Sequence, residues 1–297
     1  MNISRLAVVG LGLIGGSLAR ALRAAGAGGE IVGCGRDARH LERARELGVI
    51  DRYATDVAGA VAGADLVVLA TPLGAMDGLF AALRPSLAPD AVITDVGSTK
   101  ASVVAAARTA LDPGQLARFV PGHPIAGTEK SGVEASFAEL FQQRRVILTP
   151  LAENPPAAVA RVRALWHAAG SEVTEMEVAH HDLVLAATSH LPHMLAYTLV
   201  DTLARMHDKD EIFGYAAGGF RDFTRIASSD PVMWRDVCLA NRDAILGMIA
   251  RFQADLALLA AAIEAGDEAV ISEVFHRAKA ARDRYAGRLD ASAGVVE

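Results

Sequence analysis

Cysteine is scarce in this sequence, with only Cys34 and Cys238 among 297 residues. The two lie far apart and have none of the short spacings that metal sites use. Free thiols of this kind are typical of a reducing compartment, so we expect a cytoplasmic protein.

An excess of basic residues is also absent. There are 29 Lys and Arg against 35 Asp and Glu, which gives a formal net charge of -6. Nucleic acid and anionic membranes both favour a basic face, so neither is an expected partner. The apolar run from Leu183 to Val200 contains two histidines and a proline, which favours a buried helix of a soluble domain over a membrane span.

A glycine-rich turn near the start indicates a dinucleotide site. A short apolar run, Leu6 to Val9, leads into the sequence GLGLIG and then into an alanine-rich helical stretch. In such a turn the first glycine allows the tight bend, the second lets backbone approach a pyrophosphate, and the third lets helix and strand pack closely. We expect these roles for Gly10, Gly12 and Gly15, with Leu13 and Ile14 opening the helix whose free N–H groups face the phosphates.

The strand and helix pattern continues along the first half of the chain. Further β-branched runs occupy Glu30 to Gly35, Ala64 to Pro72 and Asp90 to Ser98. This alternation predicts an α/β Rossmann-type domain with a doubly wound parallel sheet. Ligands bind such sheets at the carboxyl ends of the strands, so Thr71, Pro72, Gly97 and Ser98 are expected to line one crevice with the glycine turn.

The residues about 20 positions beyond the last glycine distinguish the two nicotinamide cofactors. Here the sequence reads Gly35-Arg36-Asp37. Gly35 has no carboxylate to repel a 2′-phosphate, and Arg36 could bind one, so we expect NADP to be preferred over NAD. Asp37 leaves NAD open, because it could bind the ribose or pair with Arg36.

The domain organisation follows from the remaining pattern. Strand, helix and strand still alternate up to Met176, and the sequence is helical beyond it, which predicts an α/β domain at 1–176 and an all-α domain at 177–297. A seam at heptad spacing suited to packing against another helix comprises Ile245, Ile249, Phe252, Leu256, Leu259 and Ile263. The seam fits a partner helix either within the chain or in a second copy.

A lone histidine stands out in the stretch PGHPIAGTEKSG, residues 121–132. Pro124 disfavours the helical conformation at His123 and should hold it extended. A histidine in a loop is more often a turn or capping residue than a catalyst. An imidazole near its usual pKa of about 6.5 is nevertheless the common choice for a general base.

Several motifs together resemble the prephenate and arogenate dehydrogenase family, also called cyclohexadienyl dehydrogenases. The motifs run in order through nearly the whole chain: 10–16, DVGSTK at 95–100, GHPIAGTEKSG at 122–132, SHLPH at 189–193 and GFRDFTRIASSDPVMWRD at 219–236. The resemblance implies oxidative decarboxylation of prephenate or arogenate, with hydride passing to NADP or NAD, in tyrosine biosynthesis. It also implies a homodimer formed through the helical domain.

The same resemblance assigns roles to individual residues. It implies that His123 is the catalytic base, with Ser98 as its hydroxyl partner. Arg225 would bind a substrate carboxylate, and further substrate contacts would come from Thr128, Glu129, His181 and His193. A helix-start acid is an alternative for Glu129. Trp234 reads as a core residue.

Alternative functions remain open at this stage. A β-hydroxyacid dehydrogenase of the 3-hydroxyisobutyrate type has a similar layout, but its interdomain lysine has no counterpart between Ser171 and Arg205. A non-catalytic NADP sensor would need the glycine turn only. His190 and His193 have a metal-like spacing, yet no further ligand completes a set, so we expect no metal. The sequence does not separate prephenate from arogenate, and any tyrosine feedback is expected to act at the catalytic site because no regulatory domain follows the helices.

Overall fold

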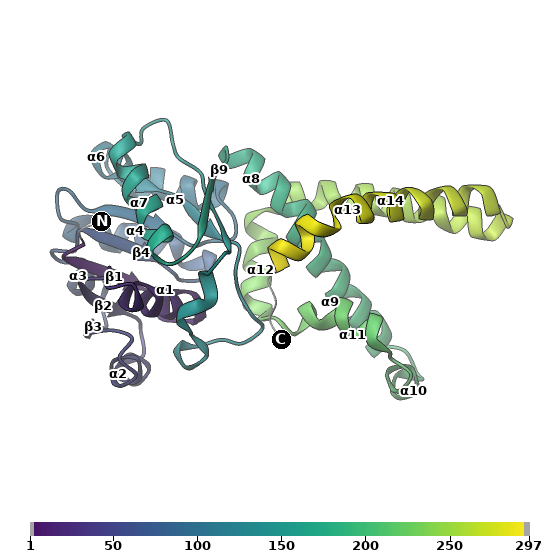
Figure 1. The fold of residues 1–297 in the computed structure, drawn as a ribbon, viewed down its shortest axis with the longest axis horizontal. Helices are drawn as coiled ribbons and strands as arrows, with labels where there is room; N and C mark the ends of the chain where they lie inside the picture. Colours follow the sequence, from purple (N-terminus) through teal and green to yellow (C-terminus); the bar gives the residue numbers. More distant parts are fainter. Residues whose placement is uncertain (1–2, 294–297) are drawn as a thin grey trace. The chain divides into compact units, whose positions relative to one another are not determined.

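A six-stranded parallel sheet forms the core of the amino-terminal half in the computed structural model, which describes residues 3–293 (Figure 1). Its strand order is β3-β2-β1-β4-β5-β6. The chain first adds β2 and β3 on one side of β1, and then crosses to add β4, β5 and β6 on the other side. The strands are β1 (Arg5–Val9), β2 (Glu30–Cys34), β3 (Arg52–Ala54), β4 (Leu66–Leu69), β5 (Val92–Asp95) and β6 (Phe119–Val120). The expected Rossmann-type sheet is confirmed.

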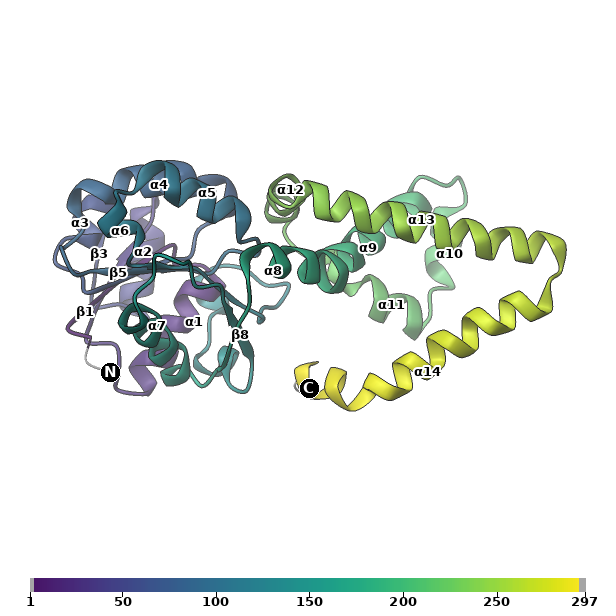
Figure 2. The ribbon, with the colours of Figure 1, turned by 90° about the horizontal axis from the view of Figure 1, so that it is seen from above.

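Helices cover both faces of this sheet, as alternation of side chains along buried strands requires (Figure 2). Leu6 and Val8 pack on the face of α1 (Leu13–Ala24), α2 (Ala38–Glu46) and α7 (Pro156–Ala168). Ala7 and Val9 pack on the opposite face. That face is covered by α3 (Val57–Val61), α4 (Met76–Leu83) and α5 (Ala101–Ala110), with the short segments η1 (Leu73–Ala75), η2 (Arg84–Ser86) and α6 (Pro113–Leu116) between and after them.

A second, three-stranded sheet follows the parallel one and carries the conspicuous histidine. β7 (Gly122–Pro124) runs antiparallel to β8 (Arg145–Leu148), which runs parallel to β9 (Glu172–Glu175). His123 pairs with Ile147 in this ladder. Between β7 and β8 the chain forms η3 (Val133–Ala135) and η4 (Ala138–Phe141), both of which pack against α1.

The rest of the chain is helical, as expected. The elements are α8 (Val178–Leu185), the π-helical η5 (Ala186–His190), α9 (Leu191–Ala204), α10 (Lys209–Gly214), α11 (Gly218–Thr224), η6 (Arg225–Ser228), α12 (Pro231–Ala240), α13 (Arg242–Ala265) and α14 (Glu268–Ala293). The π-helical turn directly precedes α9, whose first turn contains Pro192.

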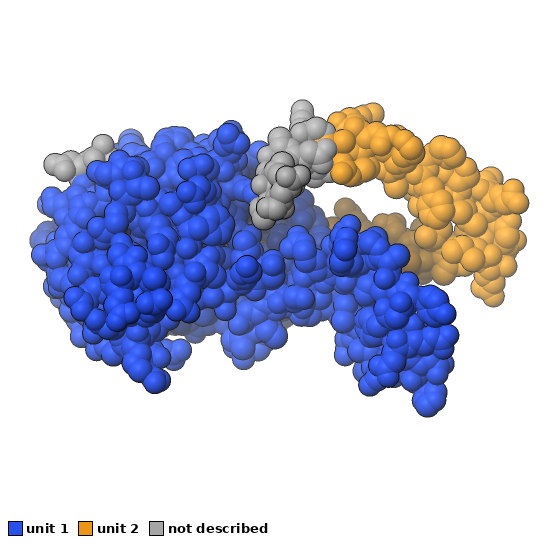
Figure 3. Space-filling view, turned by 60° about the horizontal axis from the view of Figure 1, so that its bottom comes forward, with its two compact units in different colours: residues 1–242 blue, residues 243–297 orange. Residues whose placement is uncertain are grey.

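Contacts divide the chain into compact units at 1–242 and 243–297 (Figure 3), whereas the sequence pattern placed a boundary after Met176. The difference arises because α8 and α12 are joined to the α/β part by hydrogen bonds, among them Asp182 to the start of α5 and Gly74 to Asp236. The helices from α8 to α12 therefore belong to the same compact unit as the parallel sheet.

By length and composition alone, two helical segments would suffice to cross a membrane: Val178–Ala204 and Arg242–Ala265. Within the first, His181, Asp182 and His190 are buried and hydrogen-bonded, which fits a helix of a globular domain. Its most apolar window is only 28% buried, less than the sequence led us to expect. In the second, the seam residues Phe252, Leu256 and Ile263 are exposed in the single chain.

Candidate active site

The glycine turn between β1 and α1 has the geometry that its sequence predicts. Gly10 adopts φ +100°, and a Cβ there would lie 2.3 Å from the Ala70 carbonyl oxygen at the end of β4. At Gly15 a Cβ would lie 2.0 Å from the Gly10 carbonyl oxygen. Only glycine fits either position. The end of β4 and the start of α1 are consequently in direct contact with the turn.

The space next to this turn fits a dinucleotide. A Cβ on Gly12 would meet nothing within 4 Å, so backbone is open to an approaching group there. No side chain caps the first turn of α1, whose N–H groups begin at Leu13 and Ile14 and remain available to phosphate oxygens. The Oγ1 atom of Thr71, just beyond β4, is buried without a hydrogen-bond partner. These unsatisfied donors and the open backbone suit a bound pyrophosphate and nicotinamide.

At the end of β2, basic side chains surround the expected ribose position. The Asp37 carboxylate accepts a hydrogen bond from the Arg39 amide at 2.9 Å and so caps α2. Arg36 is exposed and has no ion-pair partner among the described residues. His40 on α2 lies 2.8 Å from the Leu11 carbonyl oxygen, which links this helix to the glycine turn.

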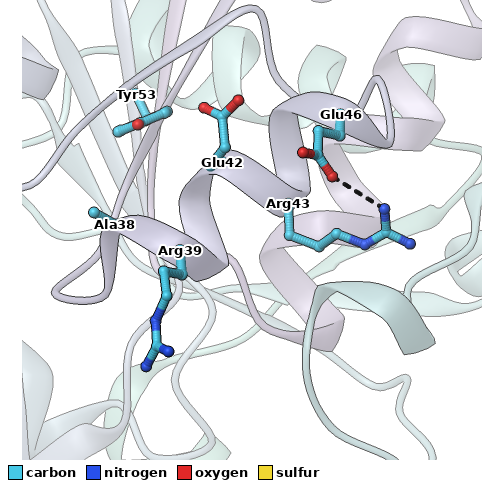
Figure 4. Close-up of a pocket in the computed structure, with 6 residues that line it drawn as sticks. All are labelled: Ala38, Arg39, Glu42, Arg43, Glu46 and Tyr53. Atoms are coloured by element: carbon cyan, nitrogen blue, oxygen red, sulfur yellow. Dashed lines mark hydrogen bonds and ion pairs between the residues drawn. The ribbon is translucent and has the colours of Figure 1, made fainter.

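A surface hollow lies on α2 and is shown in Figure 4. Arg43 pairs there with Glu46, and Glu42 pairs with Arg45 on the same helix. Arg39 extends away from both glutamates, with 96% of its side chain exposed. Both of its glutamates are ion-paired with arginines and its lining includes no histidine, so we take the buried His123 as the candidate base.

His123 occupies a fixed position on β7. Its backbone is extended, as Pro124 predicted, and its side chain is only 8% exposed. The strand is attached to the end of β5, because the Gly122 amide donates to Asp95 Oδ1 at 3.1 Å. The base candidate is therefore held by backbone and not by a mobile loop.

The ring of His123 contacts a second histidine. Its Nδ1 atom lies 3.0 Å from Nε2 of His181 on α8. Burial lowers the pKa of His123 well below its usual value, with further lowering from His181, Lys100 and His190. His123 is hence neutral at physiological pH, as a proton acceptor must be.

His181 and Ser98 differ in how they relate to His123. The His181 ring is fully buried, with both nitrogens within hydrogen-bond distance of other side chains, so it offers no free atom to a substrate. Ser98 follows β5 and is half-buried, and it makes no hydrogen bond to His123 within the described chain. Ser98 thus remains free to contact a ligand, whereas His181 lies against the base.

A buried ion pair supports the strand that carries His123. Lys100 Nζ lies 2.5 Å from Asp95 Oδ2 and donates to the Gly122 carbonyl oxygen at 2.6 Å. Both charged side chains are fully buried. Burial lowers the pKa of Lys100, while the charges of Asp95 and Asp182 oppose that effect.

Asp182 anchors the network at its other end. Its two carboxylate oxygens accept the Lys100 and Ala101 amides at 2.7 and 2.9 Å, so it occupies the amino terminus of α5. Oδ1 also lies 2.8 Å from Nδ1 of His181. Burial opposes ionisation of Asp182, but the hydrogen bonds from His181, Lys100 and Ala101 outweigh it and lower the pKa.

Two more histidines face Trp234, which is buried as the sequence predicted. His193 stacks on the indole with ring centroids 3.6 Å apart, and its Nδ1 lies 2.9 Å from the Ser189 carbonyl oxygen. His190 Nδ1 lies 3.1 Å from the Asn241 amide, and burial lowers the pKa of His190 to about 4. No group of three or more metal-ligating side chains occurs in the described part of the chain.

Arg225 and Glu129 face each other at the exposed side of the site. Arg225 Nη1 lies 3.6 Å from Glu129 Oε2, and burial together with the charge of Arg225 lowers the pKa of His193. Glu129 lies in a loop where no helix starts, so the helix-start alternative is wrong. Thr128 is half-buried beside it, with its hydroxyl accepting the Lys130 amide.

Sequence reasoning missed four residues of this network: Asp95, Lys100, Asp182 and Asn241. Asp95 and Lys100 lie in the motif DVGSTK, at the end of an apolar strand, where two charged residues beside buried neighbours were an available signal. Asp182 directly follows His181. Nothing in the sequence pointed to Asn241, because its partners are 51 and 59 residues away.

Comparison with known proteins agrees with this geometry. Family models match in succession, as the prephenate dehydrogenase nucleotide-binding domain over residues 18–175 and the prephenate dehydrogenase dimerization domain over 177–277. The chain belongs to the prephenate dehydrogenase family. The resemblance, the two-part fold class and the expectation of a nicotinamide-dependent dehydrogenase of tyrosine biosynthesis are confirmed, and neither alternative function is favoured.

Known relatives match this chain over almost its whole length. The cyclohexadienyl dehydrogenase of Zymomonas mobilis is 42% identical, over 93% of this chain and 94% of its own. The prephenate dehydrogenase of Bacillus subtilis is 37% identical, over 93% of this chain and 74% of its own. A crystal structure of the Aquifex aeolicus prephenate dehydrogenase with hydroxyphenyl propionate and NAD+ has a TM-score of 0.88 at 37% identity, covering 96% of this chain and 99% of that one.

Proposed function

We propose that this dehydrogenase oxidatively decarboxylates prephenate, arogenate or both, to 4-hydroxyphenylpyruvate or tyrosine respectively, with His123 as the general base. The observation that carries the proposal is the buried His123 on β7, a strand attached to the end of β5 by the hydrogen bond from the Gly122 amide to Asp95. When bound, the nicotinamide accepts the hydride from the ring carbon that bears the hydroxyl. His123 takes the hydroxyl proton, loss of the ring carboxylate as carbon dioxide leaves an aromatic phenolate, and return of the proton to its oxygen gives the phenol product.

The substrate carries carboxylate groups that need a cation. Arg225 supplies it, since among the described residues its guanidinium is paired with the exposed Glu129 alone, which a substrate carboxylate can replace. Thr128 and His193 line the same side, and His193 presents its free Nε2 atom because Nδ1 is engaged with the Ser189 carbonyl. Ser98 contacts the substrate hydroxyl from the end of β5.

We propose that Gly10, Gly12, Leu13, Ile14, Gly15, Thr71 and Pro72 hold the cofactor and that NADP is preferred over NAD. Support for the preference comes from Arg36, which is exposed and unpaired among the described side chains, whereas the Asp37 carboxylate is already used as the cap of α2. A 2′-phosphate would find a cation there and no free carboxylate. The related Aquifex enzyme, by contrast, is known in complex with NAD+.

We further propose a cytoplasmic homodimer. The family model over 177–277 is that of a dimerization domain, and α13 presents Phe252, Leu256 and Ile263 to solvent in the single chain. A row of large apolar side chains on one helix is stabilised when a second copy covers it. Sedimentation or light scattering should give twice the chain mass.

The test is the rate of nicotinamide reduction with each substrate combined with each cofactor. We expect at least one of the four pairs to be turned over, with the higher kcat/KM for NADP. Inactivity of all four pairs would remove the proposed function, and a strong preference for NAD would remove the cofactor assignment.

The base is tested by His123→Asn. General base catalysis contributes about 10²–10⁴-fold, so kcat should fall by that order while the Kd for the cofactor stays within about twofold. The matched control is His180→Asn, at an exposed position on α8. A kcat that barely changes in His123→Asn would show that another group takes the proton.

A further inference from the structure

Three side chains form a continuous hydrogen-bonded chain that ends on the base. Asp182 Oδ1 lies 2.8 Å from His181 Nδ1, and His181 Nε2 lies 3.0 Å from His123 Nδ1. Asp182 and His181 are 5% and 0% exposed, and His123 is 8% exposed. Nothing in the reaction proposed above requires His181 or Asp182 to touch a substrate.

The direction of both hydrogen bonds in this chain follows from the ionised carboxylate of Asp182. Asp182 accepts two backbone amides, from Lys100 and Ala101, and its lowered pKa keeps it ionised, so it has no proton to donate. The proton between Asp182 and His181 consequently sits on Nδ1 of His181. With this as the only proton on its ring, His181 has a bare Nε2, which can only accept. The proton between the two rings must sit on Nδ1 of His123.

From this polarity we infer that His181 and Asp182 are positioning residues that set the tautomer of His123, so that Nε2 of His123 is the atom that takes the substrate proton. The inference rests on the proposed function in naming that proton. A neutral imidazole protonated on Nδ1 has its only lone pair of basic character on Nε2. The opposite tautomer would present a proton to the substrate hydroxyl and could not act as a base.

The same chain stabilises the product of proton transfer. Once Nε2 has taken the hydroxyl proton, His123 is an imidazolium whose Nδ1–H still donates to His181. The charged and titratable groups around the two rings are Lys100, Asp95, Asp182 and His190. Lys100 disfavours the imidazolium, and its charge is opposed by Asp95 at 2.5 Å. Asp182 supplies the negative charge at the end of the chain, as the carboxylate does in other histidine bases that are oriented by a third group.

The tautomer can be measured directly on the wild-type protein. Labelling the nine histidines with 15N and recording long-range 1H–15N spectra separates protonated from unprotonated ring nitrogens, and His123→Asn identifies the His123 signals. We expect His123 to be neutral with the proton on Nδ1. A neutral ring protonated on Nε2 would overturn the inference. This measurement needs no substrate, so it stands even if all four substrate and cofactor pairs are inactive and the proposed function fails.

Variants of His181 test the effect on catalysis. His181→Leu removes the acceptor, and we expect a mixed tautomer at His123 with kcat reduced on the order of 10²-fold and substrate KM within about threefold. His181→Gln can place an amide oxygen near the former Nε2 position. We expect this variant to keep His123 in the Nδ1–H form and to have a kcat at least about tenfold higher than that of His181→Leu. The controls are His180→Leu and His180→Gln, the same changes at the exposed neighbouring position.

The outcomes separate positioning from packing. Equal losses of kcat in His181→Leu and His181→Gln with an unchanged His123 tautomer would assign His181 to packing and overturn the inference. A kcat for His181→Leu within twofold of wild type would do the same. If His181→Leu does not fold, the wild-type spectrum and His181→Gln still decide, because the inference requires the Nδ1–H form in both.

Discussion

Lys100 and Asp95 form an ion pair in which neither side chain reaches solvent, with Nζ 2.5 Å from Oδ2. Lys100 also donates to the carbonyl oxygen of Gly122, the residue before His123. Asp95 accepts the amides of Gly97 and Gly122. The pair joins the end of β5 to the strand that carries the base, so its integrity decides where the imidazole lies.

Removing the cation alone should destabilise the fold. Lys100→Met leaves Asp95 as an uncompensated buried charge, and we expect the free energy of unfolding to fall by about 3–5 kcal/mol. The double variant Asp95→Asn with Lys100→Met carries no buried charge at this position and should recover part of the loss. Denaturant unfolding measures both. A single variant as stable as wild type would mean that Asp95 is neutral in the folded protein.

The activity should persist into mildly acidic solution. Burial lowers the pKa of His123, and the nearby cation of Lys100 lowers it further. The neutral form is the base, and it is lost only as the pH falls through the lowered pKa, so the acid limb of kcat/KM should lie below about pH 6.5. Circular dichroism at each pH controls for unfolding. An acid limb above pH 6.5 would contradict this assignment.

Arg225 should act on substrate binding more than on turnover. A hydrogen bond to a charged group is worth about 1.5–3 kcal/mol, so Arg225→Ala should raise substrate KM by roughly 10- to 150-fold. Arg225→Lys should restore little, since lysine does not provide the planar bidentate fork. Arg205→Ala, at an exposed position on the surface, is the control. Unchanged KM in Arg225→Ala would exclude a role in carboxylate binding.

Glu129 should compete with the substrate for Arg225. Its carboxylate lies 3.6 Å from the guanidinium, and the pair is exposed. Exposed pairs contribute up to about 1 kcal/mol, so Glu129→Gln should lower substrate KM by about twofold to fivefold. A steady-state comparison of KM with each substrate measures this change. A KM that rises instead would show that Glu129 itself binds the substrate.

Arg36 should determine the preference for NADP, the cofactor that carries a 2′-phosphate. In Arg36→Ala we expect kcat/KM for NADP to fall at least about tenfold, as loss of a charge-assisted hydrogen bond predicts, with that for NAD within about twofold. Arg45→Ala removes a cation that pairs with Glu42 on the same helix and serves as the control. Equal losses with both cofactors would place Arg36 on a part of the nucleotide that NAD and NADP share.

The sequence predicted the glycine turn and the strands of the sheet because both depend on residues that are close together in the chain. The φ of Gly10 and the contact of Gly15 with Gly10 depend on residues that are close in the sequence. Alternating burial on both faces of β1 follows directly from its apolar run. The extended backbone of His123 likewise follows from the proline after it.

The partners of His123 could not be predicted in this way. His181 lies 58 residues further along the chain, and only the packing of α8 against the start of α5 brings the two rings together. For the same reason the compact units divide at residue 242, although the two family models meet at the boundary expected after Met176. Hydrogen bonds between distant residues, such as Asp182 with Lys100, leave no periodic trace in the sequence.

The position of Asp182 at the amino terminus of α5 has a consequence for synthesis of the chain. Asp182 follows Lys100 by 82 residues, so the first turn of α5 cannot acquire its cap until α8 has left the ribosome. All strands of the parallel sheet emerge well before that moment, whereas the imidazole of His123 still lacks the neighbour that orients it. The arrival of α8 therefore completes the hydrogen-bonded network around His123.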